Sequence, residues 1–264
     1  TQSRSSAASD VYKRQLLGWL WTPYDPLALD LRARLQAPGA AHWLGTDEYG
    51  RDVLSRLMAA ARTSVTISAL TVSFAVAFGI VLGALSGYAR GWIDRVVMLL
   101  TDTLLAFPSI LLALALLSIL GANIWGVILA LGLAYMPTVT RVVRGAVMSL
   151  REQEFIEASR LMGHPAGYTL RAHVIPNCLA PVIVIATSMF GSVLLTESAL
   201  SFLGLGVPPP APTWGNMLAG ARPYMSQASW LGIFPGLCIA LTLLGINLFG
   251  DYVRDRFDPR MKGL

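Results

Sequence analysis

Residues 63–89 read TSVTISALTVSFAVAFGIVLGALSGYA, a run of 27 positions without Asp, Glu, Lys or Arg. A helix needs about 20 apolar residues, each rising about 1.5 Å, to cross a hydrocarbon core of roughly 30 Å. The run therefore predicts a membrane-spanning helix at about 65–88. Hydrophobic residues make up 55% of the 264 positions and charged residues 13%, which leaves too few polar residues to cover a soluble domain of this size.

Three more uncharged runs complete the set of predicted spans. The run 103–140 would be about 57 Å long as one helix, nearly twice the bilayer core, so the Gly-Ala-Asn sequence at 121–123 predicts a turn between two helices. The other two runs are 172–196 and 223–250. The sequence thus predicts an all-α polytopic membrane protein with five full spans, at about 65–88, 98–120, 124–143, 178–200 and 230–250.

The chain starts with two segments of different amino-acid composition. Residues 1–14 are polar and Ser-rich, and we interpret them as a non-native or disordered start. Residues 15–24 (QLLGWLWTPY) are apolar but too short to span, and we interpret them as the remnant of a truncated first transmembrane helix. Residues 25–62 would then be a periplasmic segment whose amphipathic end, Arg51 to Arg62, lies along the outer surface. The transmembrane domain would occupy residues 63–264.

The distribution of Lys and Arg predicts the orientation of these spans. The connections on one side carry 11 of these residues, and those on the other side carry 6. Basic loops stay in the cytoplasm, so the first side is predicted to be cytoplasmic. That side comprises residues 89–97, 141–176 and 251–264; the other comprises 23–62, 121–123 and 201–229.

The longest connection on the cytoplasmic side, residues 144–176, has the pattern of a helix–turn–helix. Ser149 to Gly163 (SLREQEFIEASRLMG) predicts a helix with a narrow apolar and small face. Gly163 suits the position just after a helix, and His164-Pro165 prevents continuation. A second short helix is predicted at about 166–173, before Ile175-Pro176. The predicted face of the first helix comprises Phe155, Ala158, Ser159 and Met162.

This loop resembles the EAA loop of ABC-importer permeases. The resemblance rests on Glu157-Ala158-Ser159, on Gly163, and on the Ile175-Pro176 pair before the next span. Ser159 departs from the second Ala of that pattern, a small change that should preserve a tight helix contact. In such permeases the loop docks into a groove on a separate ATPase subunit and transmits its closure. The alternative from periodicity alone is an interfacial helix without a partner.

Two further stretches narrow the resemblance to one subfamily. Both are similar to the C-type permease of dipeptide, oligopeptide and nickel ABC importers. The first stretch is residues 42–52 (HWLGTDEYGRD). The second is residues 197–206 (ESALSFLGLG), followed by the Pro cluster and Trp214-Gly215. The match covers about residues 22–264. It implies a type I ABC-importer permease fold in the cytoplasmic (inner) membrane of a bacterium or archaeon, and a peptide or nickel cargo.

The resemblance also implies the partners. They are a related second permease, two cytoplasmic ATPases, an extracytoplasmic binding protein and the lipid bilayer. No cofactor is expected on this chain, because its two lysines, Lys13 and Lys262, lie outside any phosphate-binding motif and ATP would be used by the partner. No nucleic acid is expected, because the basic residues are scattered between apolar stretches rather than gathered on one face. The cysteines Cys178 and Cys238 have no metal-site spacing.

Four residues near the spans are candidates for the pathway or for partner contact. Acidic residues near spans are the usual place to look for transport sites, which singles out Asp102 and Glu197. Trp214 and Gly215 lie in the Pro-rich outer loop 201–229, which we expect either to receive the binding protein or to form a lid on its own bundle.

Two other functional classes remain as alternatives. A self-sufficient secondary transporter would carry two internal repeats with discontinuous helices, and neither is evident. An intramembrane enzyme would place catalytic residues inside the spans, whereas His42, His164 and His173 all fall in predicted loops or at a boundary. A stripe of small residues, Gly79, Gly83 and Gly87, is typical of close helix packing.

Overall fold

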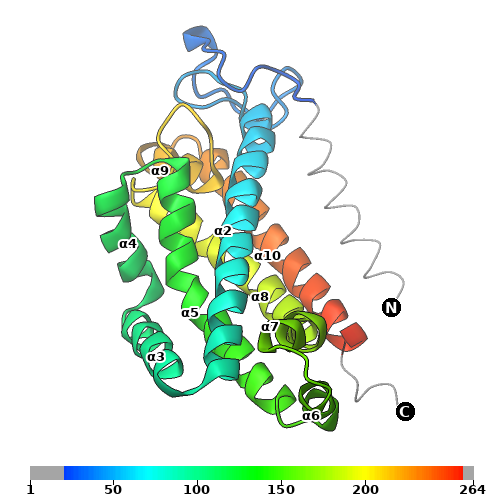
Figure 1. Cartoon of the computed structure of the whole chain (residues 1–264). Coiled ribbons are helices and arrows are strands. Elements are labelled where there is room, and N and C mark those ends of the chain that lie inside the picture. Colours follow the sequence, from blue (N-terminus) through cyan, green and yellow to red (C-terminus); the bar gives the residue numbers. More distant parts are fainter. Residues whose placement is uncertain (1–20, 258–264) are drawn as a thin grey trace.

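Long helices connect two ends of the molecule in the computed structural model, which describes residues 21–257 (Figure 1). Within that range the isolated bridge between Thr46 and Asp52 is the sole extended pairing. The elements, in chain order, are η1 (Leu31–Ala33), α2 (Val53–Ala89), α3 (Gly91–Leu105), α4 (Ser109–Leu120), α5 (Ile124–Leu150), α6 (Glu154–Leu161), α7 (Ala166–Thr169), η2 (Leu170–Val174), α8 (Ile175–Phe202), α9 (Trp214–Ala221), η3 (Arg222–Tyr224) and α10 (Trp230–Phe257).

Of the described residues, four helical stretches are long and apolar enough to cross a membrane: α2, α5, the run Ala166–Phe202 and α10. A fifth span exists if α3 and α4 count as one, but these two helices are bent by 97°. The bend falls inside the span predicted at about 98–120, at Phe107-Pro108. Pro108 has no backbone N–H to donate, and its ring disfavours helical backbone at the preceding residue, Phe107. Pro108 itself is non-helical, with ψ 131°.

Helix α2 begins earlier than predicted, at Val53 rather than about residue 65. The Asp52 carboxylate caps it by accepting hydrogen bonds from the backbone N–H of Ser55 at 2.8 Å and from its hydroxyl at 2.7 Å. The run Arg51 to Arg62, expected to lie along the outer surface, instead forms the first turns of this helix. Val53 and Leu57 in these turns are buried, because α9 packs against them.

Helices α2 and α5 form the main packing interface, and their contact depends on glycine. A Cβ at Gly83 would lie 2.6 Å from the carbonyl oxygen of Thr140 and 2.7 Å from Cβ of Val143. The predicted close-packing stripe is thus confirmed, because two helices approach this closely only where one presents no side chain. Gly79, Gly83 and Gly87 pack against Val139, Val143 and Val147, respectively.

The turn predicted at 121–123 is confirmed. Helix α4 ends at Leu120, Gly121 adopts φ +81°, and the Asn123 side chain caps α5 by accepting from the Gly126 N–H at 2.8 Å. Pro137, in contrast, lies inside a continuous α5. Of the segment interpreted as a helix remnant, residues 15–20 lie outside the described residues, as do residues 1–14, and residues 21–24 are not helical.

The connections gather at two opposite ends of the bundle. One end, called the outer end here, holds residues 21–52, the turn 121–123 and α9 (Figure 1). The opposite, inner end holds the α2–α3 junction, α6 and α7. This division matches the two sides predicted from the sequence, so the more basic connections do share one end.

Candidate functional site

The loop 144–176 at the inner end is built differently from the single helix predicted at 149–163. Helix α5 continues to Leu150, residues 151–153 form a turn, and α6 begins only at Glu154. The reason is the contact of α5 with α2, since Val147 is fully buried and Arg151 donates to the carbonyl oxygen of Tyr88 at 2.8 Å. The end of α2 therefore fixes where α5 stops.

Gly163 ends α6 as the sequence predicts. Its φ of +78° is a left-handed conformation that costs other residues roughly 1–2 kcal/mol. The Gly163 N–H donates to the carbonyl oxygen of Arg160 at 2.9 Å, and the His164 N–H donates to that of Ser159 at 3.3 Å. These two bonds are those of a Schellman motif, which turns the chain sharply and directs it into α7.

The Ser159 hydroxyl, at the position where this loop departs from the EAA pattern, contacts α7. Its oxygen lies 3.1 Å from the hydroxyl oxygen of Thr169, and both side chains are buried. A second contact, to Nδ1 of His164, measures 3.4 Å. Ile156 is fully buried in the same core. Thr169 and Ile156 were not identified from the sequence; Ile156 lies one position from the predicted apolar face.

Three large apolar side chains of the loop are exposed, beside charged ones such as Glu157 and Arg160. Leu161 is 83% exposed, Met162 68%, and Phe155 43%. Of the four residues on the predicted face, Ser159 alone is buried, so most of this face points away from the bundle. Glu157 and Ala158 are also exposed. The loop thus combines an internally bonded backbone with an uncovered apolar surface outside the predicted spans.

The pair Ile175-Pro176 does not separate a short helix from the span. Residues 166–202 form one helical run, with a π-helical turn at Leu170–Val174. Pro176 sits in the first turn of α8, and the wider π-turn accommodates its missing N–H. The expected break before residue 178 is therefore wrong, and the loop continues directly into a membrane-long helix.

Two arginines connect the loop to the end of α2. The guanidinium carbons of Arg151 and Arg160 lie 5.9 and 5.2 Å from the centre of the Tyr88 ring. An exposed ion pair of 3.2 Å joins Arg90 to Glu152. These contacts hold the loop against α2 as well as against α8.

Asp102 has an ion-pair partner. Its carboxylate accepts from Arg141 at 2.7 Å, and both side chains are more than half exposed. A second, less exposed pair joins Asp94 of α3 to Arg144 of α5 through two hydrogen bonds of 2.6 and 2.7 Å. Asp102 thus attaches α3 to α5, as Asp94 does.

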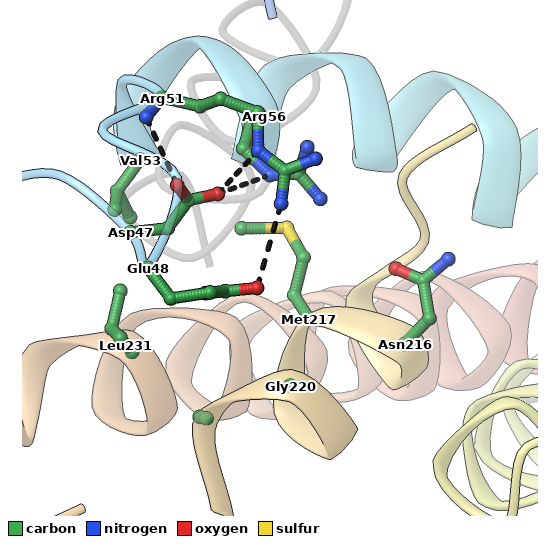
Figure 2. Close-up of a pocket in the computed structure, with 10 residues that line it drawn as sticks. Asp47, Glu48, Arg51, Val53, Arg56, Asn216, Met217, Gly220 and Leu231 are labelled. Carbon is green, nitrogen blue, oxygen red and sulfur yellow. Dashed lines mark hydrogen bonds and ion pairs between the residues drawn. The ribbon is translucent and has the colours of Figure 1, made fainter. Parts of the chain in front are cut away.

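A group of charged side chains near the outer start of α2 was not predicted as a unit (Figure 2). Asp47 lies 2.7 Å from Nε of Arg51 and 3.3 Å from Nε of Arg56. Arg51 also lies 3.6 Å from Glu48. Residues of α9, including Met217, complete the lining of a small pocket at this point. Asp47, Glu48 and Arg51 belong to the 42–52 stretch that carries the family resemblance, but Arg56 and the packing of the cluster against α9 were not predicted from the sequence.

Trp214 and Gly215 are buried. The Trp214 indole N–H donates to the carbonyl oxygen of Leu57 at 3.3 Å, and its backbone N–H donates to the Ser64 hydroxyl, also at 3.3 Å. A Cβ at Gly215 would lie 2.4 Å from the carbonyl oxygen of Ser198. In this conformation neither residue is available for contact with a binding protein. The structure supports the alternative, a lid that packs on its own bundle.

Glu197 lies inside the molecule where α2, α8 and α9 meet, and its side chain is fully buried. One carboxyl oxygen accepts from the Ser201 hydroxyl at 2.8 Å, while the other has no hydrogen-bond partner.

The membrane-long helices make this a multi-pass membrane protein, and its fold is that of a type I ABC-importer permease. The permease chain of the inward-facing MetNI methionine ABC transporter superposes with a TM-score of 0.64 over 76% of this chain and 96% of that chain, at 16% identity. A chain of an amino acid ABC transporter gives a TM-score of 0.58 over 76% and 94%, at 14% identity.

Residues 79–263 match the family described as the binding-protein-dependent transport system inner membrane component, and the chain belongs to this family. The dipeptide transport system permease protein DppC of Alkalihalophilus pseudofirmus is 45% identical over 87% of this chain and 75% of its own length. A protein of Brucella suis biovar 1 that is named as a peptide permease is 42% identical over 91% of this chain and 80% of its own length. The predicted resemblance and fold class are confirmed.

Proposed function

We propose that this chain is the permease subunit of an ATP-driven peptide importer, forming half of the translocation pathway across the inner membrane. The names of its relatives support the cargo, because proteins over 40% identical to it are named as dipeptide or peptide permeases. Nickel is the second cargo that the sequence resemblance implies. The proposed partners are a related permease, an extracytoplasmic binding protein and two ATPases, which use the ATP.

The observation that carries the coupling part of this proposal is the exposed apolar surface of loop 144–176. Leu161 and Met162 project from a loop whose own core is closed by Ile156 and Ser159. Burying such side chains against a partner contributes about 25 cal/mol per Å² of apolar area removed from water. We propose that this surface, with Glu157, Ala158 and Gly163, enters the groove of the ATPase, and that Ile175 and Pro176 pass its displacement into α8.

Replacing Leu161 by Asp tests the docking. Leu161 is 83% exposed, so the variant should fold normally and lose its ATPase subunits during purification of the assembled importer. Leu31→Asp is the matched control, because Leu31 is 71% exposed at the outer end. Retention of the ATPases by Leu161→Asp, or equal loss with Leu31→Asp, would contradict docking through this loop.

Transport itself is tested in proteoliposomes that contain the whole importer and its binding protein. We expect ATP-dependent uptake of a labelled dipeptide, with no uptake of Ni²⁺ under the same conditions. Uptake of Ni²⁺ without uptake of the dipeptide would contradict the peptide cargo and identify the metal as the cargo. Uptake without ATP would favour the self-sufficient transporter and reject the importer.

A further inference from the structure

The carboxyl of Glu197 occupies a position in which an ionised group is hard to stabilise. It is fully buried, its Oε1 accepts from Ser201, and its Oε2 has no partner. The hydroxyls of Ser64 and Ser198 also face this carboxyl. The Ser198 hydroxyl is likewise buried without a partner. A buried carboxylate with one unbonded oxygen costs several kcal/mol unless a cation or further donors compensate it.

Within residues 21–257, the helices around this carboxyl supply no such cation. Helix α9 has no charged residue, and α8 has none besides Glu197 itself. On α2, Arg56 pairs with Asp47, and the side chain of Arg62 is exposed.

The remaining neighbours of α8 give the same result. On α5 the closest titratable group along the interface is Tyr135, whose hydroxyl lies 2.8 Å from that of Thr196. Helix α4 has no charged residue, and the charged residues of α10 lie near its C-terminal end, beyond residue 250. Arg222 of η3 donates to the carbonyl oxygen of Phe202 at 2.8 Å, at the end of α8.

We propose that Glu197 is a proton-binding site that locks the outer junction of α2, α8 and α9. The bound proton resides on Oε2, the carboxyl oxygen that has no hydrogen-bond partner, while Oε1 continues to accept from Ser201. A neutral carboxyl with an unbonded oxygen costs less to bury than an ionised one with the same contacts. Since Ser64 also accepts from the Trp214 N–H at 3.3 Å, the neutral carboxyl is linked to the start of α9.

Opening of this junction would admit water to the carboxyl. The proton would then pass from Oε2 to a water molecule at the outer end, leaving a solvated carboxylate. The junction should therefore close less readily as the pH rises. A link between this step and the transport cycle rests on the proposed function, whereas the proton site itself does not.

Thermal unfolding of the assembled importer at acidic and alkaline pH tests the site. Glu197→Gln keeps an uncharged hydrogen-bonding side chain, so its midpoint should equal the wild-type value at acidic pH and exceed it at alkaline pH. The sign follows because the folded wild type holds a proton that the unfolded chain releases, so its stability falls as pH rises. Ser188→Ala is the control, since Ser188 is exposed and bonds carbonyl oxygens of its own helix; its pH profile should match the wild type.

Infrared spectroscopy gives a second readout, which does not rely on unfolding midpoints. The wild-type protein with carboxyl-labelled glutamate should show the stretch of a protonated carboxyl at neutral pH, and Glu197→Gln should lack that band. Absence of the band from the wild type would overturn the proposal. Identical pH profiles for the wild type and Glu197→Gln would overturn it as well. Neither measurement depends on transport, so failure of the importer proposal would be distinguished from failure of this one.

Discussion

The buried hydroxyl of Ser159 on α6 lies 3.1 Å from that of Thr169 on α7. This is a direct side-chain link across the turn of loop 144–176, and it joins the exposed helix α6 to the helical run that continues into α8. A displacement of α6 would thus be transmitted to α8 through this hydrogen bond as well as through the backbone that connects the two helices.

We predict that Ser159→Ala and Thr169→Val each destabilise the loop by about 1 kcal/mol. Each substitution removes one partner of the hydrogen bond between the two hydroxyls and leaves the other hydroxyl buried without that bond. The double variant should lose less than the sum of the two. Hydrogen exchange of the α6 amides measures the effect. Additive losses would show that the two hydroxyls are not coupled. Ser118→Ala, which removes an exposed hydroxyl bonded to the carbonyl of Ala115, should change nothing.

Gly163→Ala should weaken the end of α6 by roughly 1–2 kcal/mol through backbone strain. No atom within 4 Å would obstruct a Cβ at this position, so its φ of +78° is the reason. Faster hydrogen exchange at the end of α6 is the expected observation. Gly167→Ala is the matched control, because its Cβ would also meet nothing within 4 Å and its φ is not positive. Equal effects of the two changes would rule out the strain.

Gly83→Ala should lower the stability of the bundle by about 1–3 kcal/mol, since its Cβ would be forced against the backbone of α5. The predicted contact with the Thr140 carbonyl oxygen is only 2.6 Å. Thermal unfolding in detergent would measure the loss. At Gly236 in α10, where a Cβ meets nothing within 4 Å, the same substitution should be neutral or slightly stabilising.

Arg144→Lys should be more damaging than Arg141→Lys. Arg144 binds both carboxylate oxygens of Asp94 and is only 26% exposed, whereas Arg141 makes one contact to Asp102 and is 56% exposed. Lysine cannot reproduce a two-pronged contact, and exposed pairs contribute about 0.2–1 kcal/mol. The midpoint of thermal unfolding should fall clearly for Arg144→Lys alone. A larger fall for Arg141→Lys would contradict this ranking.

Several features of the site were accessible from sequence because their cause is local. Gly163 was assigned to a helix end since glycine tolerates the backbone angle required there. The turn at 121–123 followed from run length, and the Gly79–Gly87 stripe followed from helical spacing. The burial of Trp214 could not be predicted from the sequence, because its hydrogen-bond partners Ser64 and Leu57 lie 150 and 157 positions away.

The sequence by itself determined which segments are long and apolar enough to cross a bilayer, how they divide between two ends, and that the chain resembles importer permeases. Those properties depend on the transfer of side chains from water to lipid and on backbone angles, both of which are set within a few residues. The tertiary structure alone decided the burial of Trp214 and the enclosure of Glu197. Each depends on which distant segments pack together, and that choice rests on the shape and polarity of surfaces that exist only after the helices have assembled.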